Sequence, residues 1–183
     1  SNGAVVEGAI AGLQAAMISS TKVEFTLDSS FFASVSGAYP TLEFGMTDTG
    51  GDYQQKIQFI KTGLHNAATT YDLWANTASF EAVVTEAAQS VVVRYRRQGA
   101  TEWAETTLTA TGDMTYKGTT TAVWSESTNV KGHTIYTPDT TKSIFANANY
   151  ECQLVVNGAA VDTATLATST TQTIPYATLE DTS

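Results

Sequence analysis

The chain has 183 residues, of which 9 are basic and 18 are acidic, and its net charge is −9. This surplus of negative charge repels phosphate backbones and anionic lipid surfaces, so nucleic acid and the membrane surface are not expected as partners. Only 15% of the residues are charged, and the many Thr, Ser, Asn and Gln residues predict a neutral, polar surface of the kind common in exported β proteins.

Short alternating runs separated by Gly, Asn, Asp and Pro predict an all-β fold. Residues 7–20 (EGAIAGLQAAMISS) favour an edge strand, with a helix as the alternative because Ala and Leu are good helix formers. In the next run, Val23, Phe25 and Leu27 fall on one side of a strand. Residues 29–37 (SSFFASVSG) are compatible with one helical turn after a serine cap or with a crossing between sheets. Residues 41–61 predict a hairpin that reverses in TDTGGD.

The alternating pattern restarts near residue 72. In QSVVVRYRRQG, residues 89–99, the side chains of Val91, Val93 and Tyr95 are expected to face a core, while Arg94 and Arg96 face outward. TEWAETTLTA (101–110) is predicted as the hairpin partner of this strand, and residues 111–143 as a long irregular section. Two final strands, NYECQLVVNG and AVDTATLATS, are joined by an Asn-Gly dipeptide at 157–158, whose tolerance of positive φ suits a tight hairpin turn.

The run IFANANY, residues 144–150, resembles the L-x-P-x-T-x-Y segment of fibronectin type III and related immunoglobulin-like modules. Ile144 stands at the leucine position, and Tyr150 at the tyrosine that makes the corner before strand F. VVVRYRRQGATEWAETTL resembles the C to C′ region of such modules, and LWANTASFEAVV resembles their A to B region. The resemblance implies two tandem antiparallel β-sandwich modules. These are an N-terminal β module over 1–70 and a fibronectin type III-like module over 71–175, followed by a linker over 176–183.

Several residues are expected to have structural roles in this arrangement. Ile144 and Tyr150 would form the corner, and Cys152 would be a small buried hydrophobe because it shares a strand face with Tyr150. Trp74 is expected to pack at the junction of the modules, and Trp103 to cover the sheet next to Tyr95. With Cys152 as the single cysteine, no intramolecular disulfide can form, and the fold must rest on its core.

The tail TQTIPYATLEDTS, residues 171–183, resembles the linker that follows fibronectin-like modules in secreted lipoproteins of gut Bacteroidetes. In those proteins the linker leads into a C-terminal jelly-roll associated with carbohydrate metabolism (PCMD-like). The resemblance implies an exported protein at the cell surface, as an outer-membrane lipoprotein, or in the periplasm. The membrane would be reached only through an N-terminal lipid anchor outside this chain, glycan would be contacted through a downstream domain, and the chain would be a monomer.

No catalytic site, metal or cofactor is expected. The sharpest nucleophilic pair is Cys152 with His133, but the expected burial of the thiol favours a structural role. Glu102 with Glu105, or Asp48 with Asp52, are the carboxylate pairs that a glycosidase would need. Each lies next to a turn, where solvated carboxylates are ordinary, and the TDTGGD spacing fits no standard calcium loop.

Two groups of residues are candidates for binding a ligand. Trp124, Tyr116 and Tyr136 lie in the section predicted to be irregular, and exposed aromatic rings stack against sugars. Arg94 and Arg96 could bind an acidic sugar, or could pair across strands with the one that carries Glu151 and Gln153. The favoured function is a non-catalytic spacer and interaction segment of a surface lipoprotein associated with glycan use. A carbohydrate-binding module and a pilus or adhesin subunit are the alternatives.

Overall fold

The computed structural model describes residues 10–48, 50–71, 76–121, 123–145 and 148–168. Over these residues it contains fourteen antiparallel strands and one short helix, so the predicted all-β class is confirmed. The elements are β1 (Leu13–Ser19), β2 (Lys22–Leu27), α1 (Ser29–Ala33), β3 (Thr41–Asp48), β4 (Gly51–Gln58), β5 (Gly63–Tyr71), β6 (Asn76–Val83), β7 (Val91–Arg97), β8 (Ala104–Thr107), β9 (Thr109–Gly112), β10 (Thr115–Thr119), β11 (Trp124–Thr128), β12 (Thr134–Pro138), β13 (Asn149–Val156) and β14 (Ala159–Ala167).

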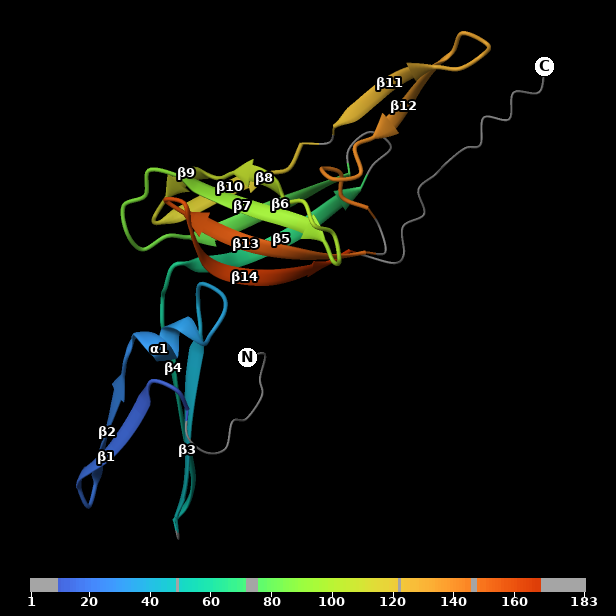
Figure 1. Ribbon diagram of the computed structural model, residues 1–183. Helices are drawn as coiled ribbons and strands as arrows, with labels where there is room; N and C mark the ends of the chain where they lie inside the picture. The colour runs from blue at the N-terminus through green and yellow to red at the C-terminus, as the bar shows by residue number, and fades with distance from the viewer. Residues whose placement is uncertain (1–9, 49, 72–75, 122, 146–147, 169–183) are drawn as a thin grey trace.

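Two four-stranded sheets form the body of the molecule (Figure 1). One has the strand order β5-β6-β10-β9 and the other β14-β13-β7-β8. Apolar side chains from both sheets meet in one buried cluster, which includes Phe80 on β6, Val93 on β7 and Leu154 on β13. Burial of this apolar surface is the main force that holds the two sheets together.

The alternation predicted for the second half of the chain is confirmed. Val91, Val93 and Tyr95 are buried, while the residues between them are partly exposed. The predicted hairpin between β13 and β14 is present, and its turn residues Asn157 and Gly158 have φ values of 50° and 84°. Both angles lie in the left-handed region, which explains why an Asn-Gly pair stands here.

An arm precedes the body and consists of two separate hairpins with α1 between them and the body (Figure 1). The hairpin predicted over residues 41–61 is confirmed as β3 with β4, and the edge strand predicted within 7–20 is β1, paired with β2. The helical turn is α1, but its cap is Asp28 rather than a serine. The Asp28 carboxylate accepts hydrogen bonds from the Ser30 and Phe31 N–H groups. The Phe25 and Phe44 rings, 3.9 Å apart between centroids, join the two hairpins.

The prediction of an irregular section over residues 111–143 is wrong. This section contains β10, which lies inside a four-stranded sheet, and the hairpin of β11 with β12, which projects away from the body (Figure 1). The predicted partner strand over 101–110 is also divided. β8 pairs with β7, but the chain crosses at the buried Leu108, and β9 joins the opposite sheet. These strands could not be predicted from the sequence, because their many Thr residues leave them without a clear apolar face.

The body begins with β5, before residue 71, where the second module is predicted to start. β5, Gly63–Tyr71, pairs with β6 from Gly63↔Val83 to Tyr71↔Asn76. Residues 13–58 contribute two two-stranded sheets and the helix. The division into modules over 1–70 and 71–175 remains a prediction, and the linker over 176–183 lies outside the described residues.

Candidate functional site

The outer face of the sheet β14-β13-β7-β8 carries a grid of polar side chains. Tyr150, Cys152 and Leu154 point into the core, so the intervening Glu151 and Gln153 point outward. The strand register places Glu151 beside Arg96 and Gln153 beside Arg94, so the strand that carries the arginines pairs with the one that carries Glu151 and Gln153. On the other side of β13, the partners of Glu151 and Gln153 are Thr165 and Thr163 on β14.

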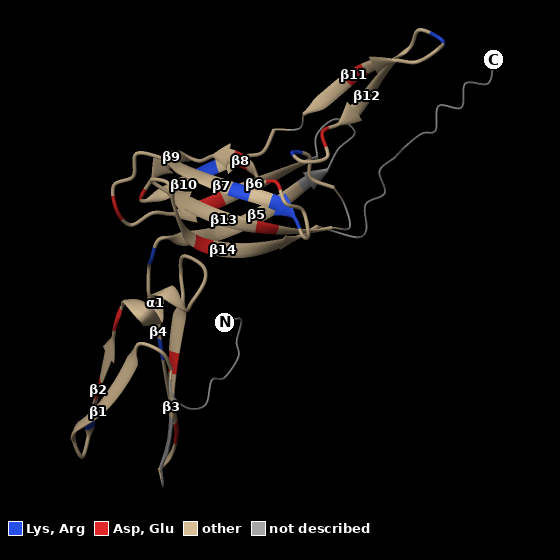
Figure 2. Ribbon diagram, viewed as in Figure 1, with Lys and Arg blue, Asp and Glu red and all other residues tan. Residues whose placement is uncertain are grey.

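Both arginines of the grid are paired with carboxylates. Arg96 Nε donates to Glu151 Oε2 at 2.7 Å, and Arg94 Nε donates to Glu105 Oε1 at 2.6 Å. Figure 2 shows the basic residues of β7 beside acidic residues of the neighbouring strands. Each exposed pair of this kind stabilises a sheet by about 0.2–1 kcal/mol. The structure therefore contains the cross-strand pairing that was the alternative to an acidic-sugar site at Arg94 and Arg96.

Trp103 lies next to Arg96, at the end of the row of the grid that contains Glu151 and Arg96. The Arg96 guanidinium carbon lies 4.3 Å from the centroid of the Trp103 ring, which is a cation–π contact. Ala104, which follows Trp103, is opposite Tyr95 and buried. Trp103 thus covers the outer face beside Tyr95, whose own ring lies in the core.

A groove of about 680 Å³ runs over the outer faces of β13 and β14. It is lined by Ser36 and Gly37 from the loop before β3, by Trp103 next to β8, and by residues of β13 and β14 that include Glu151, Gln153, Thr163 and Thr165. The contribution of Ser36 and Gly37 could not be predicted from the sequence, because these residues lie more than 100 residues from β13. The period-two alternation of β14 does place Thr163 and Thr165 outward, and that signal was available from the sequence.

Asp162 fixes the loop at Gly37 to the body. This residue is 8% exposed, and its Oδ2 accepts hydrogen bonds from the Leu64 N–H at 2.8 Å and the Gly37 N–H at 3.1 Å. A Cβ atom on Gly63 would lie 2.7 Å from the Gly37 backbone and 2.9 Å from Asp162 Oδ2. We call this contact of Asp162 with Gly37 and Leu64 the joint. The joint requires glycine at 63, because any side chain there would push the loop away from β14.

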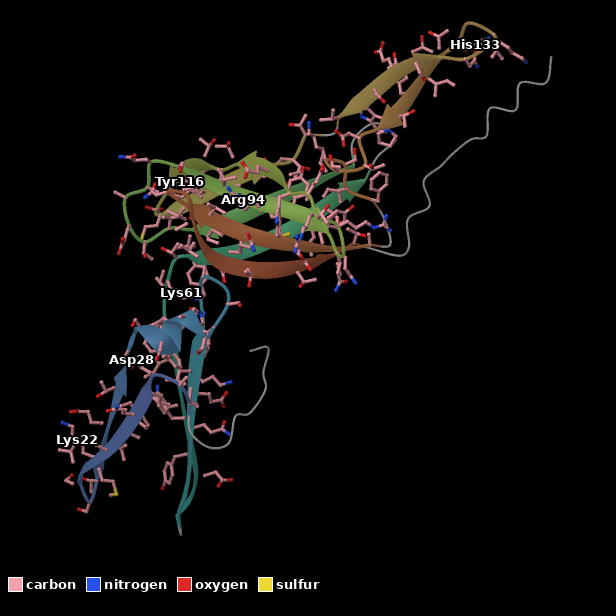
Figure 3. All side chains as sticks on the ribbon, viewed as in Figure 1. Lys22, Asp28, Lys61, Arg94, Tyr116 and His133 are labelled. Carbon is pink, nitrogen blue, oxygen red and sulfur yellow. The ribbon has the colours of Figure 1, made fainter. Side chains whose placement is uncertain are left out.

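A second polar contact fixes α1 at the same joint. The Lys61 ammonium donates to the carbonyl oxygens of Phe32, at 2.8 Å, and Val35. Figure 3 places Lys61 between the arm and the body and Asp28 on the far side of α1. Carbonyl groups at the end of a helix lack partners within the helix, and a lysine ammonium satisfies them.

The aromatic candidates do not form one cluster. Tyr116 on β10 is partly buried against the core, at the end of the body away from His133 (Figure 3). Trp124 and Tyr136 lie on the projecting hairpin, where Trp124 pairs with Pro138 and Tyr136 with Glu126. Because side chains alternate along a strand, Trp124 and Tyr136 share one face of this hairpin. Tyr136 is 53% exposed, and Trp124 is partly exposed.

The predicted structural residues are placed as follows. The Tyr150 hydroxyl accepts a hydrogen bond from the Phe145 N–H at 2.8 Å and donates to the Ser143 carbonyl at 3.4 Å. Ile144, which lies between Ser143 and Phe145 in the sequence, is fully buried. The Tyr150 side chain thus binds the backbone five and seven residues before it in the sequence. Trp74 lies outside the described residues.

The structure separates Cys152 in the core from His133 (Figure 3). Burial raises the pKa of the Cys152 thiol to about 12, which keeps it protonated. His133 lies at the tip of the projecting hairpin (Figure 3), and Glu105 is paired with Arg94. Asp48 and Asp52 flank the turn between β3 and β4, where their Cα partners are Gly51 and Thr47. Among the residues that the structure describes, no group of three or more His, Cys, Asp or Glu side chains is placed to hold a metal ion.

The described part of the chain has no helix whose length and apolar character would let it cross a bilayer. The chain matches no protein-family model, no curated protein and no solved structure.

Proposed function

We propose that this chain is a non-catalytic spacer and interaction segment of an exported cell-surface lipoprotein associated with glycan use. The observation that carries the spacer role is the Asp162 joint. A buried carboxylate that accepts two backbone hydrogen bonds holds its partners in one geometry, and Lys61 ties α1 to the same place. A joint fixed in this way keeps the arm and the body at a set separation, which is what a spacer requires.

The body of the proposed spacer is a fibronectin type III-like sandwich. If β5, β6, β7, β8, β9, β10, β13 and β14 are taken as strands A, B, C, C′, D, E, F and G, the two sheets read A-B-E-D and G-F-C-C′. Immunoglobulin-like sandwiches share this order. Tyr150 then lies at the start of strand F, two residues before Cys152, where the tyrosine of the corner is found in such domains. The hairpin of β11 with β12 would be an insertion between E and F.

The stiffness of the joint can be measured with two spin labels. Thr21, in the turn between β1 and β2, and Glu86, on the body, are both exposed, so cysteines at these positions accept labels. Cys152 is buried and stays unlabelled. Pulsed electron resonance should give a narrow distance distribution that broadens in Asp162→Ala and not in Thr163→Ala, the neighbouring outward residue. A parent distribution as broad as that of Asp162→Ala would reject the spacer role.

The cellular setting has a separate test in the complete reading frame. A lipidation cysteine before residue 1 and a jelly-roll after residue 183 are the features expected. A frame that encodes neither would remove the lipoprotein setting and the downstream glycan contact, and would leave the stiffness of the joint unaffected.

A carbohydrate-binding module is the second candidate, and one observation favours it. Trp124 and Tyr136 present two aromatic rings on one face of a hairpin that projects from the body (Figure 1). Titration of the tryptophan fluorescence with polysaccharides, on the parent chain and on Trp124→Ala, tests this candidate. It requires a saturable signal that Trp124→Ala abolishes, and a response that survives this change would exclude the hairpin as the binding site.

A further inference from the structure

The groove over β13 and β14 has the chemical features of a saccharide site, and it lies apart from the projecting hairpin. The length of the groove across the strands can be judged from the strand order. From β14 to Trp103 beside β8 the sheet spans three interstrand spacings, or about 14 Å at about 4.8 Å each. This length accommodates a short run of sugar rings lying across the strands.

The floor of the groove offers polar groups without a hydrogen-bond partner in the part of the chain that the structure describes. Over the described residues, the Gln153 amide and the hydroxyl groups of Thr163 and Thr165 make no side-chain hydrogen bond within the protein. Glu151 binds Arg96 through Oε2, which leaves Oε1 to accept from a ligand. An amide, two hydroxyl groups and a carboxylate oxygen in adjacent rows can donate to and accept from the hydroxyl groups of a sugar.

Trp103 supplies an aromatic wall that is held in place. Its ring is stacked on the Arg96 guanidinium, and Arg96 is itself held by the ion pair with Glu151. This row, Glu151-Arg96-Trp103, favours one orientation of the ring before any ligand binds. A fixed aromatic surface loses little conformational freedom on binding, which favours affinity.

The charges of the groove select the class of sugar. The residues that line it include the acidic Glu151 and Asp162 and no lysine or arginine, and the nearby guanidinium groups of Arg94 and Arg96 are paired with Glu105 and Glu151. The whole chain has a net charge of −9. The acidic residues of the groove and the negative net charge of the chain both repel an anionic ligand. We infer that this groove binds a neutral oligosaccharide, stacked on Trp103 and hydrogen-bonded to the rows of β13 and β14; the inference rests on the glycan association of the proposed function.

Fluorine resonance on the full 183-residue chain tests the site. Labelling with 5-fluorotryptophan gives one resonance for each of the three tryptophans, which single Trp→Phe variants assign. The probes are soluble neutral glycans (maltoheptaose, galactomannan, xylan and mixed-linkage β-glucan), with polygalacturonate and heparin as acidic counterparts. We expect at least one neutral probe, and neither acidic one, to shift the Trp103 resonance in a saturable way while the Trp124 resonance stays in place.

Variants separate the groove from its alternatives. Trp103→Ala should weaken binding about tenfold or more, since an aromatic stack contributes on that scale, and Trp124→Ala should leave the affinity unchanged. Thr165→Val keeps a β-branched residue on the strand and leaves Trp103 in place, so its expected severalfold loss holds even if Trp103→Ala unfolds the sheet. A shift of Trp124 alone, a response to acidic probes, or no response to any neutral probe would overturn the inference. The spacer role is unaffected by these outcomes because the spin-label distances are measured without sugar.

Discussion

The corner at Tyr150 gives a prediction that can be worked from its contacts. Replacing Tyr150 by Phe removes one hydroxyl from a residue that is 2% exposed. The Phe145 N–H then loses its 2.8 Å acceptor, and the weaker 3.4 Å contact to the Ser143 carbonyl is lost as well. A partly buried donor left without a partner costs about 1–3 kcal/mol. We therefore expect Tyr150→Phe to lower the free energy of unfolding by about 2 kcal/mol.

The assay is urea unfolding followed by circular dichroism, with thermal unfolding as a second readout. For a chain of this size about 2 kcal/mol corresponds to a fall in Tm of about 4–8 °C. Tyr136→Phe is the matched control, because Tyr136 is 53% exposed and water can replace its partners; its Tm should not change.

A substitution at the neighbouring Ser143 should not lower the free energy of unfolding. The Ser143 hydroxyl oxygen is buried and makes no hydrogen bond to any residue that the structure describes. Ser143→Ala removes this unsatisfied group and should leave stability unchanged or raise it. If Tyr150→Phe is neutral, or if Ser143→Ala destabilises as much as Tyr150→Phe does, the assignment of the corner hydrogen bonds is wrong.

Three further predictions concern the joint, the helix cap and the buried thiol. Asp162→Ala should accelerate hydrogen exchange at the Leu64 amide by at least tenfold, because that buried donor loses its acceptor; exchange as slow as in the parent would contradict the joint. Hydrogen bonds from Ser30 lower the pKa of Asp28, so the cap is intact above the ordinary pKa of 3.8 and is lost as the pH falls through the lowered value. The acid sensitivity of amide exchange in α1 should therefore disappear in Asp28→Ala. Burial raises the pKa of Cys152 from 9.0 to about 12, so the neutral thiol stabilises the fold below pH 9 and this stabilisation is lost as the pH rises toward 12. Cys152 should resist an aromatic disulfide reagent at pH 8 until urea unfolds the chain, and rapid labelling of the folded protein would contradict its burial.

The sequence by itself determined the features that depend on local alternation. Val93 and Cys152 face the core and Arg96 faces outward because successive side chains on a strand point to opposite faces, so one apolar set fixes the orientation of the whole strand. The turn at Asn157 is equally local, since it depends on which residues tolerate positive φ. The strand β10 escaped prediction because its Thr, Lys and Gly residues form no continuous apolar face.

Only the tertiary structure decided which distant segments meet. In the sequence, Asp162 is an ordinary polar residue of an alternating strand. In the structure, its carboxylate accepts hydrogen bonds from the Leu64 amide, 98 residues away, and from the Gly37 amide, 125 residues away. The groove has the same origin, because one wall comes from the loop at Gly37 and the other from Trp103. Period-two patterning sets the face on which a side chain lies, but it carries no information on which loop closes over that face. That choice is made by the packing of the two sheets and by the backbone donors that a buried carboxylate must find.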